Sequence, residues 1–129
     1  MKQRTIYAFA LSMMLTTLTY GQKVGGDRDT HGCIGSAGYI YSSIKDSCIQ
    51  PWMEKTKLQG VGTGNVGFIA PLIFSKDKKK AEVLMPKGGV ILTRKGKTNK
   101  YVLAKDKLEL TVSRGYYLRQ AGTIIFQLD

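Results

Sequence analysis

The sequence predicts an all-β fold: a small antiparallel barrel or meander of about seven strands, preceded by a disulfide-pinned hairpin. Three observations lead to this prediction. From Phe68 onward, segments rich in β-branched, aliphatic and aromatic residues begin every 7 to 13 residues, a spacing typical of all-β domains. The links between them are short and rich in turn-forming residues, which permits antiparallel neighbours but no crossover helix. No amphipathic helical pattern occurs after the first 21 residues.

Residues 1–21 have the pattern of a secretory signal peptide. Lys2 and Arg4 give a positive start, an uncharged and mostly apolar stretch follows, and Thr-Tyr-Gly places small residues where a signal peptidase reads them. The alternative is a retained membrane anchor, but the apolar part is shorter than the roughly 20 residues that a spanning helix needs. We therefore expect cleavage before Gln22, a periplasmic or secreted location, and no transmembrane segment in the mature chain. Cleavage would leave 18 basic and nine acidic residues, a net charge of +9.

Residues 22–67 form a Gly-rich segment that contains both cysteines of the chain. Outside the cytoplasm, Cys33 and Cys48 most simply form one structural disulfide; a redox pair would favour closer spacing, and a metal pair would need further ligands. Short strands around Ile40 and Ile49, joined through Lys45-Asp46-Ser47, would make a hairpin that packs on the β domain. Its aromatic residues, Tyr39, Tyr41 and Trp52, would either pack on that domain or form an exposed binding surface.

Residues 68–129 form the expected antiparallel β domain. Leu108-Glu109-Leu110-Thr111-Val112 alternates strictly, so Leu108, Leu110 and Val112 should face the core. Ile124 and Phe126 alternate in the same way against Ile125 and Gln127. The expected strands are Phe68–Phe74, Ala81–Met85, Val90–Arg94, Lys100–Ala104, Leu108–Val112, Gly115–Arg119 and Thr123–Leu128. Closing them into a barrel would remove exposed strand edges.

Positive charge is concentrated in the β domain. Residues 76–119 contain 13 basic and four acidic side chains, whereas residues 22–75 contain five and four. Many of the lysines lie in the turns, where they protect strand edges or form an electropositive rim for an anionic partner. A nucleic-acid partner is not expected, because of the compartment and because no exposed stacking aromatics alternate with the basic residues.

The sequence contains no recognisable catalytic machinery. A single His excludes a multi-His metal site, and two Cys exclude a four-Cys zinc site. Asp27, Asp29 and His31 alternate along the chain and could hold a divalent ion, but no fourth ligand is evident, so a polar N-terminal arm is favoured. Ser36 lies in no nucleophile elbow. We expect no enzymatic activity, no metal and no cofactor.

Residues 68–126 resemble the C-type lysozyme inhibitors, small periplasmic or lipid-anchored barrels of Gram-negative bacteria. The resemblance lies in Ala81-Glu82-Val83-Leu84-Met85, in Lys100-Tyr101-Val102 with the following Lys105-Asp106-Lys107-Leu108-Glu109-Leu110, and in Arg119-Gln120-Ala121-Gly122. That family inserts a Ser-Gly-x-x-Tyr loop and a nearby basic side chain into the lysozyme cleft. Here Lys97 and Thr98 stand at the Ser and Gly positions. Gly32–Trp52 instead resembles an element, with the spacing G-C-x-x-S-A-G-Y and C-I-x-x-[WF], of secreted Bacteroidota proteins.

Two functions follow as hypotheses. In the first, the chain inhibits a lysozyme-like hydrolase by inserting a hairpin loop into its cleft, where a lysine would meet the catalytic carboxylates. The net charge favours an acidic target, because strongly basic lysozymes would be repelled. In the second, it is an envelope-associated structural protein that rests on anionic lipid or polysaccharide. The expected contact residues are Lys95, Lys97, Thr98 and Tyr101, supported by Lys105 or Lys107.

Overall fold

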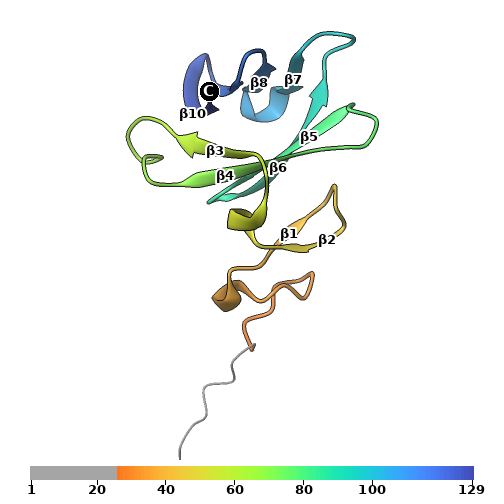
Figure 1. Ribbon diagram of the computed structural model, residues 1–129, viewed down its shortest axis with the longest axis vertical. Helices are drawn as coiled ribbons and strands as arrows, with labels where there is room; N and C mark the ends of the chain where they lie inside the picture. The colour runs from red at the N-terminus through yellow and green to blue at the C-terminus, as the bar shows by residue number, and fades with distance from the viewer. Residues whose placement is uncertain (1–25) are drawn as a thin grey trace, which may run out of the picture.

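A closed antiparallel barrel of eight strands and a two-stranded hairpin make up residues 26–129, the part of the chain that the computed structural model describes (Figure 1). The expected signal peptide lies outside the described residues. The hairpin strands are β1 (Ile40–Ser42) and β2 (Ser47–Ile49). The barrel strands are β3 (Lys57–Gly60), β4 (Ile69–Phe74), β5 (Lys80–Met85), β6 (Gly88–Arg94), β7 (Lys100–Leu103), β8 (Leu108–Val112), β9 (Tyr116–Gln120) and β10 (Thr123–Leu128). Three single-turn 3₁₀ helices, η1 (Gly35–Ala37), η2 (Pro51–Met53) and η3 (Ala104–Asp106), complete the described elements.

The barrel is an up-and-down meander in which every neighbouring pair of strands is antiparallel. Consecutive strands from β3 to β10 pair in chain order, and β10 closes the barrel by pairing with β3, Phe126 opposite Gly60. The fold class expected from the sequence is therefore confirmed, and closure leaves no barrel strand with an unpaired edge. Among the described residues, no helix is long and apolar enough to cross a membrane.

Alternating residues of the strands fill the inside of the barrel. Leu58, Leu92, Leu110 and Leu118 are fully buried there, and Phe126 is 1% exposed. Leu108 and Val112 pack in the same core, so the face expected for β8 is the observed one. Burial of a large aliphatic or aromatic side chain contributes about 1.5–3 kcal/mol, which makes this cluster the main source of barrel stability.

Two features of the barrel differ from the expectation. The strand β3 is part of the barrel, although its residues lie in the segment that was expected to precede the β domain. Gly60 of this strand has no room for a side chain, because a Cβ would lie 1.8 Å from the Asn65 carbonyl oxygen. In β10 the pairing with β9 shifts between Ile124 and Phe126. A bulge of this kind interrupts the alternation of faces, so that Ile125 packs against the core in the place expected for Ile124.

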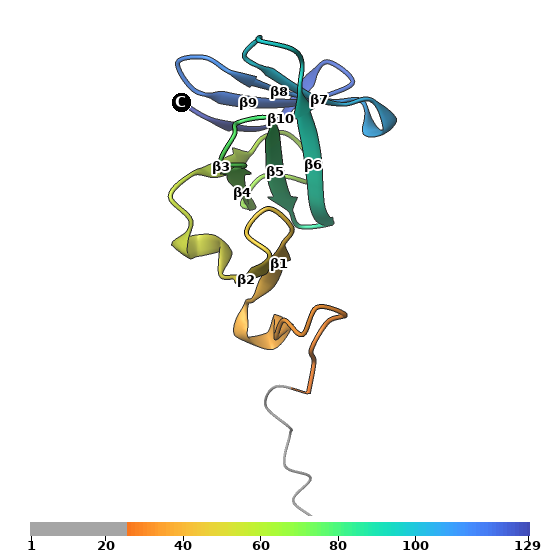
Figure 2. The ribbon, with the colours of Figure 1, turned by 90° about the vertical axis from the view of Figure 1, so that its right-hand side faces the viewer.

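The hairpin covers the outer wall of the barrel below β4 and β5 (Figures 1 and 2). Ile49 of the hairpin packs with Ile73 of β4 and Leu84 of β5, and Ile40 and Ile44 extend the contact. The middle residues of β4 and β5 are consequently buried on both faces, the inner face by the barrel core and the outer face by the hairpin.

One buried carboxylate fixes the hairpin at this place. Glu82 of β5 is 2% exposed, and its oxygens accept hydrogen bonds from the Ser42 hydroxyl at 2.6 Å and from the backbone amides of Ser43 and Ile44 at 2.8 and 3.2 Å. These three donors belong to the end of β1 and the turn that follows it. In addition, Lys45 in that turn forms a salt bridge with Glu54, which follows η2, with 2.6 Å between Lys45 Nζ and Glu54 Oε1.

The disulfide expected between Cys33 and Cys48 is present and joins the N-terminal arm to β2. The aromatic side chains of this segment do not pack on the barrel. Trp52 lies over Gly38 and is 51% exposed, Tyr39 is 37% exposed, and the Tyr41 ring stacks on the His31 ring. Aliphatic residues, Ile40, Ile44 and Ile49, make the hairpin's apolar contact with the barrel instead.

Candidate functional site: the basic end of the barrel

An up-and-down barrel places alternate turns at opposite ends, because each strand reverses the direction of the one before it. One end contains the β4–β5 turn (residues 75–79), the β6–β7 turn (95–99) and the β8–β9 turn (113–115). We call it the basic end, since it contains six cationic side chains against one acidic residue within these turns: Lys76, Lys78, Lys79, Lys95, Lys97, Arg114 and Asp77. The other end contains residues 61–68, 86–87, 104–107 and 121–122, with Lys87, Lys105, Lys107 and Asp106.

The β6–β7 turn is held in one shape by its own hydrogen bonds. The Thr98 amide and hydroxyl both donate to the Lys95 carbonyl, at 3.1 and 2.5 Å, and the Arg94 side chain donates to the Thr98 carbonyl at 2.7 Å. Gly96 has a φ of +57°, a conformation that glycine adopts without strain. The turn therefore presents Lys95 and Lys97 from a fixed backbone.

The neighbouring β4–β5 turn is fixed by an acidic side chain. Asp77 accepts hydrogen bonds from the Ser75 hydroxyl at 2.6 Å and from the Lys79 amide at 3.0 Å. These bonds lower the pKa of the Asp77 carboxyl, the hydroxyl bond having the larger effect. The β4–β5 turn also lies beside the end of β6, from which the β6–β7 turn starts, since the Arg94 amide donates to the Lys79 carbonyl at 2.8 Å. The two turns form one connected surface.

A hollow of about 270 Å³ opens at the barrel mouth between these turns. Phe74, Tyr101 and Tyr116 line it, and their rings pack at 5.4 and 6.2 Å between centroids. The ammonium group of Lys78 lies 5.0 Å from the centroid of the Phe74 ring, within the range of a cation–π contact. Arg94 lines the opposite wall, and neither cation has an acidic partner among the described residues.

The residues expected at the contact do not all lie together. Lys95, Lys97 and Thr98 share the β6–β7 turn, with Tyr101 below them in β7. Tyr101 is 5% exposed, and its hydroxyl donates to the Lys78 carbonyl at 2.9 Å, so it anchors the adjacent β4–β5 turn and is shielded from a partner. The Thr98 hydroxyl is engaged within its own turn.

Lys105 and Lys107, expected to support the contact, lie at the other end of the barrel. Both lie in the connection between β7 and β8, which runs away from the β6–β7 turn to the opposite end. There the Lys107 carbonyl accepts from the Ala121 amide at 2.9 Å in the β9–β10 turn. Lys78 and Lys79, from a separate segment of the sequence, lie beside the β6–β7 turn, and Arg94 directly precedes that turn.

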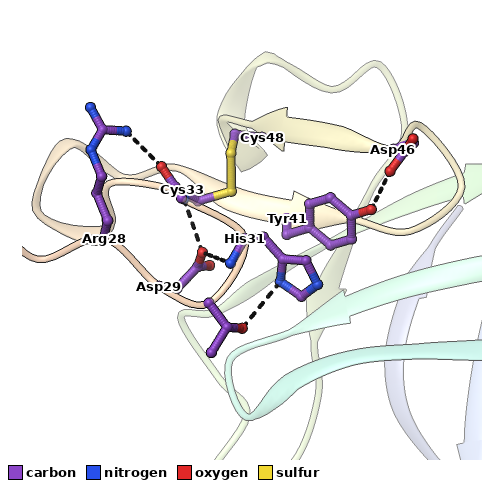
Figure 3. Close-up of a disulfide and its surroundings, with 9 residues drawn as sticks. Arg28, Asp29, His31, Cys33, Tyr41, Asp46 and Cys48 are labelled. Carbon is purple, nitrogen blue, oxygen red and sulfur yellow. Dashed lines mark hydrogen bonds between the residues drawn. A yellow bond between two sulfur atoms is a disulfide. The ribbon is translucent and has the colours of Figure 1, made fainter.

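The polar residues of the N-terminal arm have structural partners (Figure 3). Asp29 accepts from the amides of His31 and Cys33 at 2.8 and 2.9 Å, and Asp27 accepts from the Ser36 hydroxyl at 2.7 Å and from the Ser36 amide. These bonds lower the pKa of both carboxyls, chiefly through the Cys33 amide for Asp29 and the Ser36 hydroxyl for Asp27. No cluster of His, Cys, Asp and Glu suited to a metal ion occurs within residues 26–129.

The phenol of Tyr41 is oriented from two sides. His31 stacks on its ring with 3.8 Å between centroids and an interplanar angle of 1°, and its hydroxyl donates to the Asp46 carboxylate, as Figure 3 shows. The bond to Asp46 raises the pKa of Tyr41. His31 thus packs the N-terminal arm against the hairpin. Its imidazole nitrogens form no hydrogen bond with Ser36 or Asp29.

Comparisons with protein-family models, with curated proteins and with solved structures give no match. The functional argument for this chain therefore depends on the geometry and charge of its own residues.

Proposed function

We propose that this chain is an exported, non-catalytic binding protein that engages an acidic partner through the basic end of its barrel. The partner that we favour is the cleft of a lysozyme-like hydrolase, entered by the β6–β7 turn. One observation carries the proposal: Lys95 and Lys97 project from an internally fixed turn, beside a second fixed turn with Lys78 and Lys79, and no acidic side chain neutralises them in the described residues.

Rigidity of the turns supports insertion into a cleft. A loop that already has its bound shape loses little conformational entropy when it binds, so more of the contact energy appears as affinity. A glycosidase cleft contains a pair of carboxylates at its centre, and a lysine ammonium that enters it is shielded from water. Such a charge-assisted contact contributes roughly 1.5–3 kcal/mol.

A matched pair of double variants tests this proposal. Lys95→Ala with Lys97→Ala removes two charges from the basic end, and Lys105→Ala with Lys107→Ala removes two from the opposite end. Inhibition of cell-wall lysis is measured with a panel of lysozymes of different net charge, an acidic one included. We expect the first variant to raise the inhibition constant for the sensitive lysozyme by at least about tenfold, the equivalent of 1.4 kcal/mol, and the second to leave it within about twofold.

The competing function, adsorption to an anionic envelope polymer or lipid, predicts another result. Binding through a broad charge field weakens steeply with salt and depends on the number of lysines more than on their position. Equal losses of binding in the two double variants, measured on an anionic polysaccharide matrix at two salt concentrations, would replace the cleft-insertion proposal with this one.

Export with cleavage before Gln22 is tested separately, by the intact mass of the exported protein. A protein that retains residues 1–21 would refute cleavage of the signal segment.

A further inference from the structure

A second hollow lies on the outer wall of the barrel and shares only Phe74 with the hollow at the barrel mouth. It has a volume of about 660 Å³ and lies between the hairpin turn and strands β4 to β6. Ile44 of the hairpin turn, Ile73 of β4 and Ile91 of β6 give it apolar surface, and Phe74 adds one aromatic edge. Volumes of 300 to about 1,000 Å³ with mostly apolar lining and a few polar groups are usual for small-ligand sites.

The apolar floor continues beyond the area that the hairpin covers. Ile73, Glu82 and Ile91 lie side by side on the outer face, because Ile73 pairs with Glu82 and Glu82 with Ile91. The hairpin buries the first two, which are 6% and 2% exposed, but leaves Ile91 half-buried. Ile91 therefore remains an apolar part of the outer wall that no described residue of the chain covers fully.

Lysines form the rim of this hollow, with no acidic side chain among its lining residues. Lys76 and Lys80 have no acidic partner within the described part of the chain, and Lys45 is paired with Glu54. The nearest acids are engaged: Glu82 lies beneath the hairpin and accepts its three hydrogen bonds, and Asp77 is bonded within its own turn. Lys76 and Lys80 are therefore the charged side chains at this hollow that remain free to meet an anion.

From this combination we propose that the hollow binds a single-chain amphipathic anion, an acyl chain that ends in a carboxylate or a similar charged group. The chain would lie on Ile44, Ile73 and Ile91, and the anionic group would meet Lys76 and Lys80. A fully polar anion would leave the apolar floor without a partner, and a neutral apolar molecule would make no use of the lysines. A neighbouring hollow of about 400 Å³ shares Ile73 and Phe74 and also contains Leu72, Met53 and the Lys45–Glu54 ion pair.

The test is a titration of the intact protein with laurate, below the concentration at which laurate self-associates, followed by backbone and methyl NMR. Acetate supplies the same charged group without a chain, and dodecyl maltoside supplies the chain without a charge. We expect saturable shifts at Ile44, Ile73 and Ile91 with laurate, at least about tenfold weaker binding of dodecyl maltoside, and no such methyl shifts with acetate.

Two variants and a control assign the effect to this hollow. Lys76→Ala with Lys80→Ala should weaken laurate binding about tenfold, since it removes both cations that meet the anionic group. Ile91→Ser should weaken binding by a similar factor, and its thermal unfolding midpoint should show that the variant is folded. Lys105→Ala with Lys107→Ala should change nothing. The proposal would be overturned by NMR shifts that do not saturate with laurate, or by equal losses of binding in the two lysine double variants. It would also be overturned if the protein bound only vesicles of phosphatidylglycerol and Ile91→Ser did not change that binding. None of these outcomes depends on hydrolase inhibition by the β6–β7 turn.

Discussion

Glu82 is the residue whose replacement should separate the hairpin from the barrel. Glu82→Ala removes the acceptor of three hydrogen bonds and leaves the fully buried Ser42 hydroxyl, which still accepts from the Lys45 amide, without an acceptor for its proton. Hydrogen bonds to a charged group contribute about 1.5–3 kcal/mol each. Burial of a carboxylate without a cation opposes this by several kcal/mol. The difference gives a cost of about 2–4 kcal/mol for hairpin docking.

Amide hydrogen exchange measures that cost at the donors themselves. At 1.4 kcal/mol for each factor of ten, exchange of the Ser43 and Ile44 amides should accelerate about 30- to 1,000-fold in Glu82→Ala. Barrel amides such as that of Leu110 should keep their protection, because the core of the barrel does not include the hairpin. Glu82→Gln keeps the shape and one acceptor oxygen, so its effect should lie between wild type and Ala.

The matched control is Glu109→Ala, which removes the same side chain from the outer face of β8, where it is partly exposed and paired with Lys100 at 3.3 Å. Exchange at the hairpin should not change in this variant. The reasoning about Glu82 would be refuted if Glu82→Ala left the Ser43 and Ile44 amides protected. It would equally fail if hairpin and barrel amides accelerated together, because the carboxylate would then stabilise the whole fold.

Three further predictions concern the disulfide, the core and the N-terminal arm. Cys33→Ser should lower the free energy of unfolding by about 2–5 kcal/mol in chemical denaturation, and two free thiols in the wild-type protein would contradict the bond. Leu110→Ala should cost about 2–5 kcal/mol and Thr111→Ala far less, so equal losses would contradict the alternation in β8. Because the pKa of the Asp29 carboxyl is lowered, its contribution to the stability of the arm is fully present above the ordinary pKa of 3.8 and is lost as the pH falls below that value. The Cys33 amide, which donates to this carboxylate, should therefore lose protection from hydrogen exchange in acid, after correction for the intrinsic exchange rate. Unchanged protection of this amide in acid would contradict the prediction.

Local patterns were sufficient for most of the barrel strands. Residues 108–112 and 123–128 form strands with the expected bounds, and the cysteine spacing together with the expected compartment predicted the disulfide. The strand β3 was missed because Lys57-Leu58-Gln59-Gly60 contains one apolar residue and pairs with both β4 and β10, contacts that no local pattern encodes. The role of Glu82 was missed for a related reason: an acidic residue in a strand ordinarily faces solvent, and only the docked hairpin makes this one a buried acceptor.

The composition of the basic end could have been derived from the strand order alone. In a meander of antiparallel strands, consecutive turns fall at opposite ends, so turns 75–79, 95–99 and 113–115 must share one end, and turns 86–87, 104–107 and 121–122 the other. Grouping the lysines by position along the chain hid this division, since residues 95–97 and 105–107 are neighbours in sequence and opposites in space. The division also decides which comparison is informative. Lys78 and Lys79 share the basic end with Lys95 and Lys97, so a control pair has to come from the other end, as Lys105 and Lys107 do, to report whether the position or the number of charges governs binding.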